Sequence, residues 1–207
     1  MRLRSALRIS AALAAVGAIT VGSRLHRGWG ATAAERAAPL PGDDLVRQPI
    51  FHSTRAITIE AAPEAVWPWI VQMGMGRGGW YSYDDWAGRV SSVSAVSASA
   101  VIPDLQDLKV GDAVDLIDRM VFRVQDLQPN RALVLHADEH QMPLQPWVKS
   151  WAFVLQPIEG GSTRLLVRER SVWRRKWVGL LTAFTNWAWF LATRRQLKNL
   201  KALAEAA

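Results

Sequence analysis

The alternation of apolar and polar residues predicts a β-sheet that occupies most of the second half of the chain. Five segments between residues 112 and 171 have a period of two, and turn signals such as Pro129-Asn130 separate them. An earlier segment alternates in the same way. The expected strands are residues 52–60, 112–117, 120–127, 132–137, 149–156 and 163–171. Because the last five are joined by short connections, we expect them to pair antiparallel.

Helical patterns stand on either side of this strand-rich region. Residues 63–73 begin with Pro63, which suits the first helical position, and carry an apolar stripe. Pro68 lies inside this segment and predicts a kink. A second short helix is expected over residues 82–90, and one long helix without proline over residues 177–206.

A glycine-rich turn and a group of aromatic rings follow the first helix. Gly74, Gly76 and Gly79 match a dinucleotide-binding pattern, but they follow a helix rather than a strand, so the nucleotide interpretation is rejected. The rings that come next offer apolar area with polar tips, which is typical of a pocket wall, although core packing explains them as well. Trp151 and Phe153 are expected on the concave face of the sheet. The candidate ligand-binding residues are Trp69, Met73, Arg77, Trp80, Tyr81, Tyr83, Trp151 and Phe153.

Charged residues on the last expected strand fall on one face. Arg164, Arg168 and Arg170 alternate with Leu165 and Val167, so the arginines are expected to point outward. An inward Arg168 would need a buried anionic partner, because an unpaired buried charge is very costly.

Composition and charge point to a membrane rather than to nucleic acid. The net charge is +7, but the basic residues flank apolar stretches at residues 2–27 and 164–201, which favours an anionic lipid surface. Residues 1–27 predict an N-terminal membrane anchor, with a cleaved signal peptide as the alternative and a slight preference for the N-terminus inside. Residues 177–192 are apolar nearly all round and rich in tryptophan, which suits a membrane interface. The chain has no cysteine.

The order of elements resembles the SRPBCC superfamily, whose fold is the helix grip (START-like, Bet v 1-like). More narrowly, the chain is similar to the bacterial branch labelled polyketide cyclase/dehydrase-like. The segments that carry the resemblance are RGWGAT at residues 27–32, PLPGD at 39–43, APEAVWPW at 62–69, GRGGWYSYD at 76–84 and TRLLVR at 163–168.

The resemblance implies an α+β helix-grip fold. A curved antiparallel sheet would wrap a long C-terminal helix, with two short helices after the first strand and an N-terminal apolar helix. We expect residues 1–27 to be the anchor or signal segment, 28–48 a linker and 49–207 the helix-grip domain.

Three functions follow as hypotheses. The first is membrane-associated binding of a small hydrophobic or amphipathic ligand, lipid-like or polyketide-like, in an internal cavity, with membrane lipids as further partners. The second is a cyclase or dehydratase that uses Tyr83 or His136 to move a proton. The third is a membrane-bound interaction module whose cavity is filled by its own side chains. Residues 136–140 hold two histidines and an aspartate but fit a polar loop better than a metal site, and no cofactor is implied.

Overall fold

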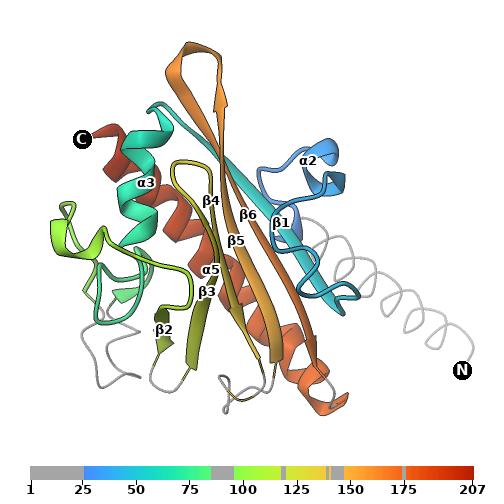
Figure 1. Cartoon of the computed structure of the whole chain (residues 1–207). Coiled ribbons are helices and arrows are strands. Elements are labelled where there is room, and N and C mark those ends of the chain that lie inside the picture. Colours follow the sequence, from blue (N-terminus) through green and yellow to red (C-terminus); the bar gives the residue numbers. More distant parts are fainter. Residues whose placement is uncertain (1–25, 85–95, 118–119, 139, 141–146, 174–175) are drawn as a thin grey trace, which may run out of the picture.

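Six antiparallel strands form one sheet in this computed structural model, which describes residues 26–84, 96–117, 120–138, 140, 147–173 and 176–207. Along the sheet the strand order is β1-β6-β5-β4-β3-β2, so the first strand closes against the last (Figure 1). The bounds are β1 (Phe51–Ile59), β2 (Ala113–Ile117), β3 (Met120–Gln128), β4 (Ala132–Ala137), β5 (Trp147–Ile158) and β6 (Ser162–Trp173). All six strands predicted from the alternation are therefore confirmed.

A long C-terminal helix crosses one face of this sheet. Figure 1 shows α5 (Lys176–Glu205) running behind the strands, where Leu197 and Leu200 are fully buried in the main core. α3 (Pro63–Val71) begins with Pro63 as predicted and tolerates Pro68 inside. The described part of the chain also contains α2 (Ala33–Ala37) and two short 3-10 turns, Pro103–Leu105 and Glu159–Gly161. This arrangement confirms the predicted α+β helix-grip architecture.

Parts of the predicted anchor and second short helix lie outside the described residues. Of the predicted anchor, only residues 26 and 27 are described, and residues 85–90 of the expected second helix are not. In the part of the chain that the structure describes, no helix is long and apolar enough to cross a membrane.

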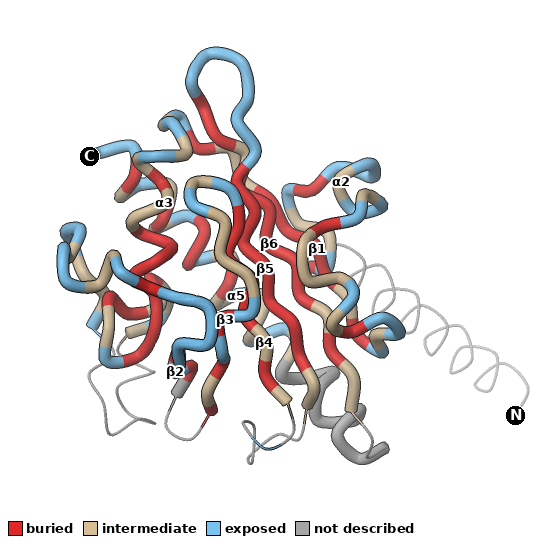
Figure 2. Tube along the Cα trace, in the orientation of Figure 1, coloured by how far each residue is buried: buried red, intermediate tan, exposed pale blue. Residues whose placement is uncertain are grey.

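The sheet buries both of its faces. The concave face holds the main hydrophobic core against α3 and α5, with Phe153, Leu165 and Val167 all buried there. The outer face holds a smaller core, in which Leu166 packs with Ala31 and Leu40 of the N-terminal part of the chain. Figure 2 shows the result, with the central strands buried and the tip of the β5–β6 hairpin exposed.

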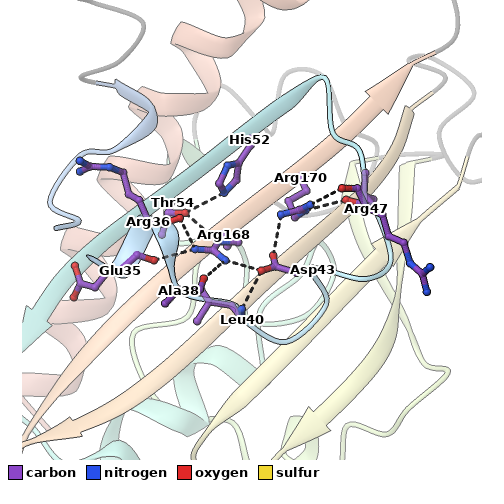
Figure 3. A network of polar contacts seen from close by, with 11 residues as sticks. Glu35, Arg36, Ala38, Leu40, Asp43, Arg47, His52, Thr54, Arg168 and Arg170 are labelled. Carbon is purple, nitrogen blue, oxygen red and sulfur yellow. Dashed lines mark hydrogen bonds and ion pairs between the residues drawn. The ribbon is translucent and has the colours of Figure 1, made fainter. Parts of the chain in front are cut away.

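Residues 31–47 form an outer cover that three arginines of β6 hold against the sheet, and Figure 3 shows two of them, Arg168 and Arg170. Arg168 donates to Thr54 Oγ1, to the Asp43 carboxylate at 2.7 Å and to three backbone oxygens of the cover. Arg164 pairs with Glu35 at 2.7 Å, and Arg170 donates to the backbone at residues 46 and 47. The arginines do point away from the main core, as predicted. Arg168 is nevertheless only 3% exposed, because the segment expected to be a linker packs over it.

Candidate functional site

Five aromatic rings gather on the concave face under α5, around Trp151. The Trp151 ring lies 5.0 Å from Trp80 in a stacked arrangement, 5.7 Å from Phe122, 4.9 Å from Phe153 and 5.2 Å from Trp189, measured between centroids. Phe122 and Phe153 are fully buried, whereas Trp80 is only partly buried. We call these five residues the ring cluster. The predicted concave positions of Trp151 and Phe153 are confirmed.

Trp80 reaches the ring cluster from the glycine-rich turn that ends α3. Gly74 and Gly79 pair as an isolated bridge, and both have a positive φ that favours glycine. A Cβ on Gly79 would lie 2.6 Å from the Ser97 Cα, so the loop at Ser97 packs directly on this turn. The Trp80 Nε1 donates to the Asp115 carbonyl at 3.1 Å. Trp80 is thus held by one hydrogen bond and one stacked ring.

Three further candidates lie in the main core near this turn. Tyr81 is 1% exposed, although its φ of 55° is uncommon for a residue other than glycine. Its hydroxyl accepts a hydrogen bond from Gln72 Nε2 at 2.7 Å, and its ring lies edge-on to Trp69. Met73 is also buried, with its sulfur 3.6 Å from Gln196 Nε2. Burial raises the pKa of Tyr81 to about 12, although the hydrogen bond from Gln72 works in the opposite direction. The phenol is therefore neutral at physiological pH.

The guanidinium of Arg77 is engaged by the backbone of the turn. Its Nε donates to the Met73 carbonyl and its Nη2 to those of Val71 and Leu105, all at 3.2 Å. The bonds to Val71 and Met73 satisfy carbonyls left open at the end of α3, and the bond to Leu105 joins the turn to the 3-10 turn Pro103–Leu105. Burial lowers the pKa of Arg77, with a nearby Asp112 opposing the shift.

The two residues considered as proton carriers lie apart from the ring cluster. Tyr83 is 40% exposed and has the Arg195 guanidinium over its ring at 4.6 Å. His136 lies in β4 between Leu135 and Ala137, both of which belong to the concave core, so its side chain is on the opposite face. Burial lowers the pKa of His136. The structure therefore brings neither residue to the interior under α5.

Three charged side chains lie beside the ring cluster on the concave face, and we call them the inner ion cluster. The Glu169 carboxylate of β6 bridges two cations, accepting from Arg55 Nη1 of β1 at 2.6 Å and from Lys149 Nζ of β5 at 3.1 Å. The side-chain exposures are 0% for Glu169 and Arg55 and 4% for Lys149. Lys149 Nζ also lies 4.0 Å from the centroid of the Trp189 ring, which joins this cluster to the ring cluster.

The inner ion cluster also contacts the beginning of the described chain and α5. Arg55 Nε donates to the carbonyl of His26 at 3.1 Å, and Arg55 Nη1 lies 3.3 Å from Thr193 Oγ1. Burial alone would raise the pKa of Glu169, but Lys149 and Arg55 outweigh it and the pKa lies below its ordinary value. Burial lowers the pKa of Lys149, and Glu169 offsets part of that shift.

Comparison with known proteins finds solved structures of low similarity to this chain. No family model and no curated protein match the sequence. Among solved structures, protein MLL2253 from Mesorhizobium loti shares 17% identity over 74% of this chain and 98% of its own, with a TM-score of 0.42. CV1439 from Chromobacterium violaceum shares 16% identity over 74% of this chain and 96% of its own, with a TM-score of 0.45. CalU16 from Micromonospora echinospora shares 15% identity over 74% of this chain and 85% of its own, with a TM-score of 0.37.

These scores are too low to carry an argument about fold or function. The assignment of fold rests instead on the strand order of this chain and on the helix that its sheet holds. The fold is a helix grip. Within this helix grip, the ring cluster and the inner ion cluster occupy the space between the sheet and α5.

The sequence interpretation found the rings of this helix grip but missed its buried charges. Arg55, Lys149 and Glu169 each stand in the inward phase of a strand. Arg55 lies on the same face of its strand as the inward Ile57 and Ile59. Lys149 stands two residues before Trp151 and therefore shares its face. A charge in the apolar phase of a strand was the available signal, because such a position demands a partner.

Proposed function

We propose that this protein binds a small hydrophobic or amphipathic molecule at the ring cluster, while its N-terminal segment holds it at a membrane. The observation that carries the proposal is the indole N–H of Trp151, which is buried at the centre of the ring cluster and has no partner among the described residues. A buried tryptophan N–H usually finds an acceptor. A bound molecule with an oxygen atom would supply one, and its apolar part would lie against the rings.

Trp80 is the residue that a ligand would displace. Its ring covers Trp151, yet it is only partly buried and hangs from a turn built on glycines. Rotation of Trp80 breaks one neutral hydrogen bond and one ring stack, each contributing roughly 1 kcal/mol. Burial of an apolar ligand contributes about 25 cal/mol for each Å² removed from water, so 100 Å² already exceeds that loss.

The membrane part of the proposal rests on the contact between the end of the predicted anchor and α5. His26 lies at the end of the predicted anchor, and its ring lies 4.9 Å from Trp187 of α5. Trp187 is 47% exposed and Leu191 is 45% exposed, so apolar side chains face outward next to the predicted anchor. Exposed tryptophan beside an apolar segment is typical of a membrane interface.

Binding is tested with the full chain in neutral nanodiscs, using the uncharged fluorescent probe N-phenyl-1-naphthylamine and empty nanodiscs as the blank. We expect saturable fluorescence enhancement above the blank. In ¹⁵N-tryptophan spectra, the indole signal assigned through Trp80→Phe should shift during the titration, because its bond to Asp115 breaks. A wild-type chain that shows no saturable binding overturns the proposal.

A second function is favoured by one specific observation. The stacking of Trp80 on Trp151, with Trp189 beside them, is the arrangement expected of an interaction module whose interior is filled by its own side chains. Such a module would give no probe binding, no shift of the Trp80 indole signal and no co-purifying molecule in native mass spectrometry. The same titration therefore separates the two functions.

The anchor is tested by alkaline carbonate extraction of membranes from cells that express the full chain. We expect the wild-type chain to stay in the membrane fraction, and a chain with Leu13→Arg and Val16→Arg to be released, because two charges disrupt the apolar run. Release of the wild-type chain, or retention of both chains, contradicts anchoring by this segment.

A further inference from the structure

The inner ion cluster carries more positive than negative charge. Arg55 and Lys149 are both buried, and within the described residues Glu169 is the only carboxylate in ion-pair contact with either cation. Two cations and one carboxylate leave an excess of one positive charge in the interior. An uncompensated buried charge is strongly unfavourable unless an opposite charge joins it.

Unused hydrogen-bond donors lie on Arg55 and on the two residues that flank Glu169 in the sheet. Arg55 uses its Nε and Nη1, but its Nη2 is buried and has no partner among the described residues. Ser53 Oγ and Trp151 Nε1 are also buried and have no hydrogen-bond partner among the described residues. In the sheet register, Ser53 and Trp151 are the two cross-strand partners of Glu169, so they lie on either side of it.

Each of these donors is costly as it stands. A buried donor without an acceptor loses its bonds to water and gains none in return. Three such donors together with one excess positive charge form an arrangement that an anionic oxygen group would complete, because a carboxylate accepts several hydrogen bonds and carries one negative charge. The apolar walls beside it are the rings of Trp151 and Trp189, the latter in contact with Lys149.

We propose that the inner ion cluster is the head-group site for an amphipathic monocarboxylic acid. The carboxylate would accept from Arg55 Nη2 and from Ser53 or Trp151, and the hydrocarbon part would lie along the ring cluster. This inference rests on the proposed binding function and names its ligand class. The single excess charge matches a carboxylate, whereas a dianionic phosphate monoester would leave an excess of negative charge.

The test compares three probes of equal chain length for displacement of N-phenyl-1-naphthylamine from the full chain in neutral nanodiscs. Octanoate should compete at least tenfold more strongly than 1-octanol, and also more strongly than octyl phosphate, after correction with empty nanodiscs. Equal competition by octanoate and octanol overturns the acid site while leaving probe binding intact. Absence of any probe binding overturns the underlying function instead. Stronger competition by octyl phosphate overturns the choice of a monocarboxylic acid.

Variants locate the site. Arg55→Gln should remove the preference for octanoate and leave octanol competition unchanged, and it leaves Glu169 paired one-to-one with Lys149. The matched control is Arg164→Gln, which removes the same charge from the opposite face of the sheet and should keep the preference. Ser53→Ala is the milder second variant, with an expected severalfold loss of octanoate affinity alone. Retention of the preference in folded Arg55→Gln and in Ser53→Ala overturns the proposal.

Discussion

Glu169 holds the inner ion cluster together, and its neutralisation should be far more damaging than loss of either cation. Glu169→Gln keeps the size of the side chain but removes the charge that Arg55 and Lys149 share at 2.6 and 3.1 Å. Two buried cations then face each other without compensation. Removing one partner from a buried ion pair costs about 3–5 kcal/mol of the free energy of unfolding. Lys149→Met leaves Arg55 and Glu169 paired one-to-one, so we expect a clearly smaller loss.

The measurement is urea unfolding followed by far-ultraviolet circular dichroism. With a slope of about 2 kcal/mol per M, a loss of about 4 kcal/mol lowers the midpoint by about 2 M. Asp107→Asn is the control, since it breaks the exposed Lys109–Asp107 pair and should leave the midpoint unchanged. The reasoning is refuted if Lys149→Met lowers the midpoint as much as Glu169→Gln does.

Three further predictions follow from single residues. In the Tyr83→Phe variant the remaining tyrosine, Tyr81, should ionise near pH 12 when its absorbance is followed at 295 nm. Because this pKa lies above the ordinary 10.0, the stability that the neutral phenol contributes is full below pH 10 and is lost as the pH rises towards 12. Ionisation near pH 10 in the folded chain would contradict the burial of Tyr81. Arg164 lowers the pKa of Glu35 from 4.5 to about 2, so the stability that this pair contributes is present above pH 4.5 and lost towards pH 2. Carbon NMR should show a higher pKa of Glu35 in the Arg164→Gln variant, and an unchanged pKa would contradict the pairing. Gly30→Ala should lower the melting temperature, because its φ is +73° and a Cβ would lie 2.0 Å from a β1 carbonyl oxygen; an unchanged melting temperature would show that this contact is wrong.

The strands and the long helix could be predicted because their periodicity is local. Residues 149–156 and 163–171 alternate cleanly, and the structure extends both strands by only a few residues. The alternation also placed Trp151 and Phe153 on the concave face correctly. Pro63 and the glycines after Met73 fixed the ends of α3 to within two residues.

The environment of the charged and polar side chains could not be read in the same way, because it depends on contacts distant in sequence. Arg168 was expected to face outward, and no local pattern indicated that Asp43, 125 residues away, would be packed over it. Arg77 was expected near a ligand, whereas its donors reach backbone carbonyls that become available only where α3 ends. Arg55 and Glu169 are 114 residues apart, and only the pairing of β1 with β6 brings them together.

The contact between His26 and Arg55 sets a limit on how far the amino terminus can be shortened in recombinant work. The carbonyl of residue 26 satisfies Arg55 Nε, and the imidazole of the same residue lies against Trp187. A protein that starts at Gly28 would leave a second guanidinium nitrogen without an acceptor in the interior and would uncover an indole on α5. A version that starts a few residues before His26 removes most of the predicted anchor and preserves both contacts, which makes it the natural starting point for crystallisation.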